Sequence, residues 1–357
     1  MAEAPRPILI DYTHCGRHVT GLERITQELF SREALAPLAV ELMTSASRKQ
    51  MLARQMFGLP WAAARRRDAI IITPGFPPSP LLTLFGARVL PYIHDLFLIT
   101  RKQDLNFRAK LYMAPPFRFA VGQLPRFLVN SLHTQDELRR FCREDAEIIP
   151  YRPGVRNVFG LSAQGRAGRD DDPRTLRLIA LGTVEPRKNL LAAAAILTAL
   201  RARHFPGATL DVVGRIGWGP DAEVLRATPG VTLHGYQSSE AGRALIEGAD
   251  LYITTAHDEG LGLPLLEVQY AGLPVIAPDK TVFREVLAGT GLLLPDVAPQ
   301  GQADAIAAMM ATQGWRAAHV ASAAANLERW NEVAAQDKSA VIALLARLSR
   351  TPLPIAA

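Results

Sequence analysis

The sequence of 357 residues contains only two cysteines, Cys15 and Cys142, which are too few for a framework of disulfide bonds. It also lacks any apolar run near the roughly 20 residues needed to cross a bilayer. Its first residues, MAEAPRPILIDYTH, have no basic patch followed by a long apolar core, so no secretory signal is expected. These absences favour the cytoplasm, and a hydrophobic content of 48% with 21% charged residues indicates a globular chain.

Acidic residues are absent from one stretch in particular, Leu42 to Arg67. The whole net charge of +6 arises in the first 150 residues, which hold 20 Lys and Arg against 14 Asp and Glu. Leu42 to Arg67 contains six basic residues interleaved with Met, Leu, Phe and Trp. Such a segment fits either a solvated helix face or a peripheral contact with the anionic inner face of a membrane. Nucleic acid is not expected as a partner, because no recognised binding motif accompanies the charge.

Short β-branched runs alternate with helical segments along the chain. PILID (7–11) and AIIIT (69–73) predict strands in the first half, and LRLIAL (176–181) and LYITT (251–255) predict strands in the second. This alternation predicts an α/β fold with doubly wound parallel sheets. A polar, glycine-rich segment separates the two halves.

The predicted domains follow from that separation. We predict an N-terminal Rossmann-like domain over residues 1–155, a linker over 156–173 and a C-terminal Rossmann-like domain over 174–330. Two closing helices are predicted at 316–331 and 332–348. The last part of the chain, 331–357, is expected to pack back toward the N-terminal domain. Two such domains facing across a cleft would hold a ligand at the carboxyl ends of their strands.

The run from His257 to Gly272 has the order strand, glycine-rich turn, helix. Gly260 and Gly262 let backbone amides approach a ligand closely, and a helix N-terminus attracts anions. Glu259, before the predicted helix, and Glu267, within its predicted first turn, would flank the docked phosphate. Carboxylates repel phosphate but accept hydrogen bonds from hydroxyls. The pattern therefore indicates a ligand with both a phosphate and a polyol, such as a nucleotide sugar.

A second motif, GTVEPRKN, spans residues 182–189 between a predicted strand and a predicted helix. Arg187 and Lys188 are two adjacent cations that suit a diphosphate. The alternative is that they only decorate the start of a helix, although cations there oppose the helix dipole. Both motifs follow strands of one predicted sheet, so they are expected to converge.

These motifs resemble the retaining nucleotide-sugar glycosyltransferases of family 4, which have the two-domain GT-B fold. The resemblance continues in TGLERITQELF (20–30), which is similar to that family's N-terminal glycine loop and helix, and in YIHDLFLIT (92–100), which is similar to its His-Asp segment. It covers nearly the whole chain. The resemblance implies that two Rossmann-like domains enclose the substrates, with the N-terminal domain on the acceptor side and the C-terminal domain binding the nucleotide sugar. It also implies that no metal or other cofactor is needed.

The family resemblance also implies roles for individual residues. Glu267 is expected to bind the ribose hydroxyls and Glu259 the donor sugar, while Lys188, helped by Arg187, neutralises the diphosphate leaving group. The implied catalytic residues are His94, Arg187, Lys188 and Glu259. The implied donor-binding residues are Gly21, Gly182, Thr183, Tyr236, Gly260, Leu261, Gly262, Leu263 and Glu267.

Four of these assignments have alternatives or departures. His94 also fits a core histidine, and Gly21 also fits a plain turn glycine. Tyr236 is placed only where the family often contacts the base. Many members carry an arginine where this chain has Thr183, so more of the charge falls on Lys188 and Arg187.

The Gly-Thr pair resembles the mannosyl-, rhamnosyl- and glucosyltransferases that build bacterial surface polysaccharide. The implied function is transfer of a hexose, with GDP-mannose the leading donor and UDP-hexoses open, to a polysaccharide or lipid-linked oligosaccharide. Two alternatives remain: a GT-B enzyme with a soluble acceptor, and a non-catalytic protein that binds nucleotide sugars.

Overall fold

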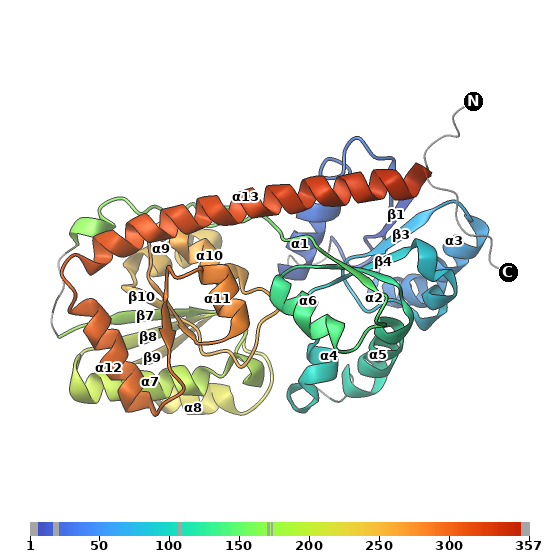
Figure 1. Ribbon diagram of the computed structural model, residues 1–357. Helices are drawn as coiled ribbons and strands as arrows, with labels where there is room; N and C mark the ends of the chain where they lie inside the picture. Colours follow the sequence, from blue (N-terminus) through green and yellow to red (C-terminus); the bar gives the residue numbers. More distant parts are fainter. Residues whose placement is uncertain are drawn as a thin grey trace. The chain divides into compact units, whose positions relative to one another are not determined.

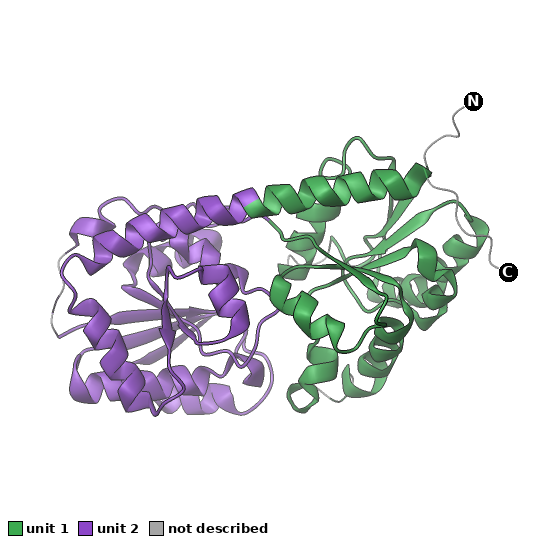
Figure 2. Ribbon diagram, in the orientation of Figure 1, with its two compact units in different colours: residues 1–153, 333–357 green, residues 154–332 purple. Residues whose placement is uncertain are grey.

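The computed structural model describes residues 6–16, 21–105, 107, 109–169, 172 and 174–350, and it divides into two compact units (Figure 2). Unit 1 comprises Met1–Pro153 and Val333–Ala357, and unit 2 comprises Gly154–Glu332. Each unit contains one six-stranded parallel sheet with helices packed on it (Figure 1). The predicted α/β fold with two parallel sheets is therefore confirmed.

The sheet of unit 1 has the strand order β2-β1-β3-β4-β5-β6, and every neighbouring pair is parallel. Its order reverses between β1 and β3, which makes that point a ligand-binding position in sheets of this kind. The strands are β1 (Ile8–Asp11), β2 (Val40–Met43), β3 (Ile70–Thr73), β4 (Val89–Ile93), β5 (Arg126–Val129) and β6 (Glu147–Pro150). β1, β3 and β4 are buried along their whole length, as their continuous apolar runs predict.

Helices and helical turns connect these strands. The α-helices of unit 1 are α1 (Gly21–Phe30), α2 (Arg48–Ala53), α3 (Leu59–Arg65), α4 (Phe97–Thr100), α5 (Ala114–Gln123) and α6 (Leu132–Arg139). A π-helical turn, η1 (Arg54–Gly58), joins α2 to α3, and a 3₁₀ segment, η2 (Pro80–Arg88), precedes β4. The N-terminal glycine loop predicted from the sequence includes Thr20, which lies outside the described residues.

The sheet of unit 2 has the order β12-β11-β10-β7-β8-β9, again with all neighbours parallel. The chain fills one side of β7 with β8 and β9, then crosses to the other side with β10, so the order reverses between β7 and β10. The strands are β7 (Arg177–Leu181), β8 (Thr209–Val213), β9 (Val231–Gly235), β10 (Leu251–Ile253), β11 (Val275–Pro278) and β12 (Leu292–Leu294). Loops that follow β7 and β10 are consequently brought together.

Two hydrophobic clusters, one on each face, stabilise the sheet of unit 2. Alanine-rich α7 packs on one face, and Trp330 of α13, only 1% exposed, packs on the other. The helices of this unit are α7 (Leu190–Arg203), α8 (Asp221–Ala227), α9 (Ser239–Gly248), α10 (Leu263–Glu267), α11 (Thr281–Leu287), α12 (Pro299–Met310) and the first part of α13 (Trp315–Arg350). None of the described helices is long and apolar enough to span a membrane.

The prediction of two separate helices at 316–331 and 332–348 is wrong, because α13 is one helix of 36 residues. Neither proline nor glycine interrupts this part of the sequence. Asn331 does not end a helix. Its side chain instead accepts a hydrogen bond from the amide of Val155 at 2.8 Å. Further along the same helix, Asp337 binds Arg152.

Candidate functional site

Two loops of unit 2 meet where the strand order reverses. The loop after β7 contains a 3₁₀ turn, η6 (Pro186–Lys188), and the loop after β10 leads into α10. Their backbones are joined directly, because the amide of His257 donates to the carbonyl oxygen of Arg187 at 2.9 Å. The Thr255 hydroxyl donates to the Asn189 carbonyl at 2.7 Å. The predicted convergence of the two motifs is therefore seen in the described structure.

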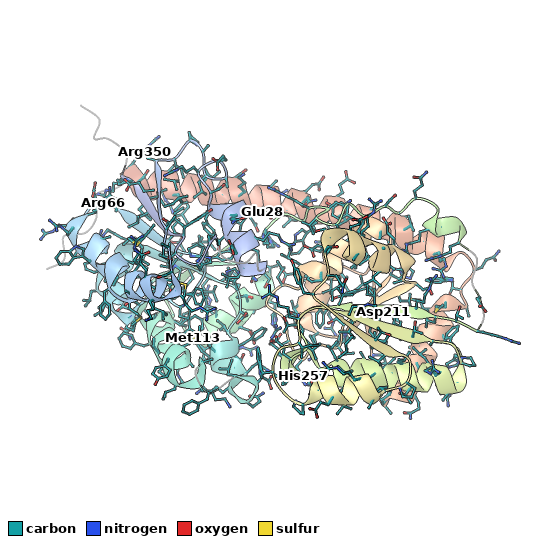
Figure 3. The ribbon with its side chains drawn as sticks, turned by 180° about the vertical axis from the view of Figure 1, so that it is seen from behind. Glu28, Arg66, Met113, Asp211, His257 and Arg350 are labelled. Atoms are coloured by element: carbon teal, nitrogen blue, oxygen red, sulfur yellow. The ribbon has the colours of Figure 1, made fainter. Side chains whose placement is uncertain are left out.

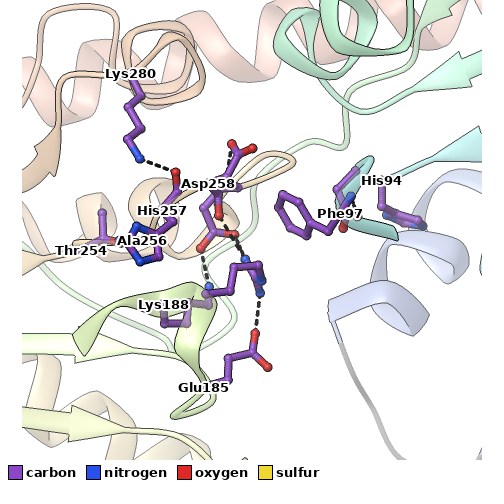
Figure 4. A network of polar contacts seen from close by, with 12 residues as sticks. His94, Phe97, Glu185, Lys188, Thr254, Ala256, His257, Asp258 and Lys280 are labelled. Carbon is purple, nitrogen blue, oxygen red and sulfur yellow. Dashed lines mark hydrogen bonds and ion pairs between the residues drawn. The ribbon is translucent and has the colours of Figure 1, made fainter. Parts of the chain in front are cut away.

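Glu259 is the centre of the polar contacts between these loops. Figure 4 shows the region, with Lys188, Glu185, His257 and Asp258 labelled. Lys188 Nζ donates a hydrogen bond to Glu259 Oε1. Arg187 Nη1 lies 3.1 Å from Oε2 of the same carboxylate, and Arg187 Nη2 lies 2.8 Å from Glu185 Oε1. Arg187 Nη1 also contacts the carbonyl oxygen of Asp258 at 3.2 Å. The two predicted cations and the predicted carboxylate thus form one ion-pair network.

The electrostatics of Glu259 follow from this network. The residue is 8% exposed, and burial alone would raise its pKa. The charges of Lys188 and Arg187 outweigh burial and hold the pKa of Glu259 below its ordinary value. Glu259 is therefore an anion at neutral pH, and the two cations at the carboxyl edge of the sheet share its carboxylate, while Arg187 also pairs with Glu185. An anionic ligand that offers more oxygens can compete for both cations.

Gly182 explains how Lys188 reaches Glu259. A Cβ atom at Gly182 would lie 3.2 Å from Lys188 Cε and 3.5 Å from its Nζ, and the residue has a φ of +136°. Gly214, after β8, is packed against the same backbone, since a Cβ there would lie 1.9 Å from the Gly182 carbonyl oxygen. Any side chain at these positions would displace the lysine or the loop itself.

The helix after the glycine-rich turn differs from the prediction. α10 has only five residues and passes into a 3₁₀ turn, η7 (Val268–Ala271). Glu267 is the last residue of α10, so its predicted place in the first turn is wrong, and so short a helix adds little dipole for an anion. Pro264 and the αL conformation of Gly262 (φ +80°) shape the start of the turn. Glu267 itself is buried, with 5% exposure.

The glycine-rich turn offers backbone donors. Among the described residues, no protein acceptor takes the amides of Leu261 and Gly262, although Gly262 accepts from the Leu265 amide at 2.9 Å. The Leu261 side chain is 4% exposed and belongs to the core of unit 2. Only the backbone of Leu261 is therefore available to bind a ligand. Gly260 and Leu263 are the residues that flank Leu261 and Gly262 in the turn.

Tyr252, in β10, is 2% exposed and belongs to the core of unit 2. Burial first, and then the carboxylates of Glu259 and Glu267, raise the pKa of Tyr252 well above its ordinary value. The phenol therefore lies within electrostatic reach of both glutamates. A tyrosine in a β-branched apolar strand is typical of a core residue. Nothing in the sequence LYITT indicates that it also interacts electrostatically with the two glutamates.

Thr183 and Tyr236 lie in the loops after β7 and β9. Thr183 packs beside Gly217, where a Cβ atom would lie 2.7 Å from the threonine methyl carbon. Tyr236 is 71% exposed, and the guanidinium of Arg215 lies 5.3 Å from the centre of its ring. An exposed aromatic ring with a cation beside it can stack on a planar ligand.

His94 and Gly21 belong to unit 1, whereas the other predicted site residues belong to unit 2. His94 follows β4, and its Nε2 donates to the Pro74 carbonyl oxygen at 2.6 Å. Burial lowers the pKa of His94 to about 4, so its ring is neutral at pH 7 and Nδ1 is the acceptor. Gly21 is the exposed first residue of α1, and a Cβ added there would meet no atom within 4 Å.

His94 also lines a hollow of about 170 Å³ within unit 1. The other walls are mainly apolar and come from β4, α5 and the loop after β3. They include Phe76, Tyr92, Asp95 and Phe117. Within each unit taken alone, the described residues bring no three His, Cys, Asp or Glu side chains close enough to hold a metal ion.

Comparison with known proteins finds similarity to glycosyltransferases, mainly in the second half of the chain. Residues 175–312 match the family model described as glycosyl transferases group 1. The chain is 34% identical over 163 residues to a phosphatidyl-myo-inositol mannosyltransferase of Mycolicibacterium smegmatis, covering 43% of this chain and 41% of that protein. It is 32% identical over 174 residues to O-antigen chain mannosyltransferase B of Escherichia coli, covering 46% and 40%. The matches thus span about two fifths of these relatives' length.

Longer but weaker similarities extend over both units. A D-inositol 3-phosphate glycosyltransferase of Streptosporangium roseum is 28% identical over 320 residues, which are 85% of this chain and 68% of that protein. Sucrose-phosphate synthase from Thermosynechococcus elongatus superposes with a TM-score of 0.70 at 16% identity, covering 96% of this chain and all of that one. WaaG, a glycosyltransferase involved in lipopolysaccharide biosynthesis, superposes with a TM-score of 0.63 at 16% identity, covering 95% of this chain and 99% of that one. The chain has the GT-B fold, and its residues 175–312 match the group 1 glycosyltransferases.

Proposed function

We propose that this protein is a retaining glycosyltransferase that moves a hexose from a nucleotide sugar, with GDP-mannose as the leading donor, to a polysaccharide or a lipid-linked oligosaccharide. The observation that carries the proposal is the network in which Lys188 and Arg187 share the single carboxylate of Glu259. The mannosyltransferase relatives support mannose as the transferred sugar. We also propose that the protein acts in the cytoplasm, at the inner face of the membrane where a lipid-linked acceptor is found.

The diphosphate of the donor takes the place of Glu259 as the partner of the two cations. A diphosphate offers several charged oxygens, whereas Glu259 offers two, so the exchange gives the cations more acceptors. Glu259, released from Lys188, then accepts hydrogen bonds from hydroxyls of the donor sugar. The amides of Leu261 and Gly262 donate to phosphate or sugar oxygens, and buried Glu267 accepts from the ribose hydroxyls.

Transfer then needs only positioning and charge stabilisation. The bond between the anomeric carbon and the diphosphate oxygen breaks as the acceptor oxygen forms its bond on the same face of the sugar. The acceptor's proton passes to the departing diphosphate, whose charge Lys188 and Arg187 neutralise. Neutral His94, with Nδ1 as an acceptor, suits a hydrogen bond to a sugar hydroxyl. No step requires a protein nucleophile.

Nucleotide binding to the Glu267→Ala variant tests the assignment of the donor site. Calorimetry with GDP and UDP should show at least about tenfold weaker binding, because the ribose loses a buried acceptor. The matched control is Glu240→Ala, in the first turn of α9. Unchanged nucleotide binding and unchanged turnover in Glu267→Ala would mean that the donor site lies elsewhere.

A thermal-shift screen of nucleotide sugars identifies the donor, because a ligand that binds only the folded chain raises the melting temperature. The relative from Streptosporangium, matched over 85% of this chain, favours a second candidate, transfer to a small soluble acceptor. Radiolabelled sugar that appears in a water-soluble product rather than in lipid or polysaccharide would select this alternative. Donor binding without transfer or hydrolysis across the whole panel would instead select a non-catalytic binding protein.

A further inference from the structure

The helical run from Arg48 to Arg65 in unit 1 is apolar on the side that faces solvent. α2, η1 and α3 follow one another in it without a break. The face packed on the sheet carries Met51 and Leu59, together with buried Gln55. The opposite face would ordinarily be polar. Here it exposes Leu52, Met56, Phe57 and Trp61, with exposed fractions of 54%, 39%, 66% and 64%.

The neighbouring segment η2 enlarges this apolar face. Leu81 is 45% exposed and Leu84 is 77% exposed. Between the two segments lies a hollow of about 560 Å³, lined by Phe57, Gly58, Pro60, Trp61, Ala64, Leu81, Leu84 and Phe85. We call the exposed side chains of Leu52, Met56, Phe57, Trp61, Leu81 and Leu84 the α3–η2 surface. Scattered exposed apolar residues are ordinary, but a contiguous group with an apolar hollow marks a binding surface.

Charge around the α3–η2 surface has one sign. Neither 48–65 nor 80–88 contains Asp or Glu, whereas Arg48 and Lys49 begin the helical run and Arg65 ends it. The Arg65 guanidinium lies 5.3 Å from the centre of the Trp61 ring, so a cation borders one of the two exposed aromatic rings. Arg66, labelled in Figure 3, instead forms an ion pair with Glu41 and takes no part. The surface is therefore apolar in its middle and cationic at its ends.

We propose that the α3–η2 surface docks on the anionic leaflet of a phospholipid bilayer. Phe57, Trp61 and Leu84 enter the boundary between headgroups and acyl chains, where apolar and aromatic side chains are favoured. Arg48, Lys49 and Arg65 remain at the level of the headgroup phosphates. A bilayer satisfies both features at once, because it presents apolar chains beneath a sheet of negative charge.

The α3–η2 surface takes only part of the stretch Leu42 to Arg67 that the sequence singled out. It also includes residues of η2, which the sequence did not indicate. It deepens the proposed function by naming the surface that would hold the enzyme beside a lipid-linked acceptor. In this respect it rests on the proposed function, although its geometry is independent of the donor site. Binding to lipid is measured without any transfer, so failure of one proposal leaves the other in place.

Vesicle flotation of the full chain tests the proposal. We expect the protein to float with phosphatidylcholine vesicles that contain phosphatidylglycerol, and to float much less with phosphatidylcholine alone or at high salt. The double variant Phe57→Ser/Leu84→Ser should reduce binding at least about tenfold, because two large side chains no longer enter the bilayer. The matched control is Val224→Ser, a 51% exposed apolar residue on α8 of unit 2, which should bind like the wild type.

Trp61 fluorescence gives a second readout that needs no destabilising substitution. On addition of phosphatidylglycerol vesicles the emission should shift to shorter wavelength, and Trp61→Phe should remove the shift. Absence of vesicle binding by the wild type, or equal binding by the folded double variant, would overturn the proposal. So would self-association that the double substitution abolishes without any vesicle binding, because a protein partner would then occupy the surface.

Discussion

Lys188 donates a hydrogen bond to Glu259 across two loops that lie 71 residues apart in the chain. Since Arg187 binds the same carboxylate, both cations are paired within the protein. The pairing limits the cost of holding like charges together near the carboxyl edge of the sheet. Under the proposed function, the donor diphosphate would replace Glu259 as the partner of these cations.

Removing the lysine charge should slow transfer more than it weakens binding. In Lys188→Met we expect kcat to fall about 100-fold, because the cation acts mainly on charge that develops on the leaving group. The dissociation constant for the donor should change by less than about tenfold. Steady-state kinetics together with calorimetry separates the two effects. Arg226→Met, an exposed cation on α8, is the control, and a loss confined to KM would contradict the assigned role.

Gly182→Ala should impair the same lysine indirectly. The added carbon would lie 3.2 Å from Lys188 Cε at a φ of +136°, so the side chain or the loop must shift. We expect a loss of about 1–2 kcal/mol in the free energy of unfolding and a lower kcat. Gly248→Ala, whose added carbon meets no atom within 4 Å, should leave both unchanged. Urea unfolding and kinetics check this, and full activity in Gly182→Ala would show that Lys188 can reach Glu259 by another path.

Stability should fall as the pH is lowered from about 6.5 toward 4, in part because of His94. Its pKa is about 4 in the folded chain against an ordinary value of 6.5. In this window the unfolded chain binds the extra proton, so the free energy of unfolding rises with pH. The contribution is at most roughly 3 kcal/mol. Urea titrations at several pH values should show a shallower dependence in His94→Gln, and an identical slope would rule out this histidine as the source.

Asp337 should stabilise the packing of α13 against the rest of unit 1. Arg152 approaches its carboxylate through Nε at 2.6 Å and Nη2 at 3.0 Å, and its backbone amide does so at 3.1 Å. Both side chains are largely buried, so Asp337→Asn should lower the free energy of unfolding by about 3 kcal/mol. Glu332→Gln, an exposed acid on the same helix, is the control. Chemical denaturation of both variants measures the difference, and equal stabilities would show that the pair contributes little.

The strands and the meeting of the two motifs could be predicted from sequence, because β-branched runs mark strands and carboxyl ends of parallel strands share an edge. Glu259 and the Arg187-Lys188 pair were found in this way. The length of α10 could not be predicted, since a run from Pro264 to Gly272 also fits one continuous helix. The continuity of α13 was missed because Asn331 looks like a helix boundary when its bond to Val155 is unknown.

Other parts of the site depend on packing that no local pattern encodes. Tyr252 has the sequence context of a core residue, and the effect of Glu259 and Glu267 on its pKa depends on tertiary packing. The exposed face of α2 to α3 was equally ambiguous, because the same spacing of apolar residues fits a buried stripe until the burial of Met51 and Leu59 fixes which side is inward.

The contact between Gly214 and Gly182 sets a limit on how this site can be redesigned. A Cβ atom at 214 would meet backbone and not a movable side chain, so no second substitution nearby can relieve it. In a library selected for a new donor sugar, position 214 should remain glycine in every active clone, while Thr183 and Tyr236 are free to vary. We therefore expect changes in donor preference to arise from substitutions at positions 183 and 236, and not at position 214.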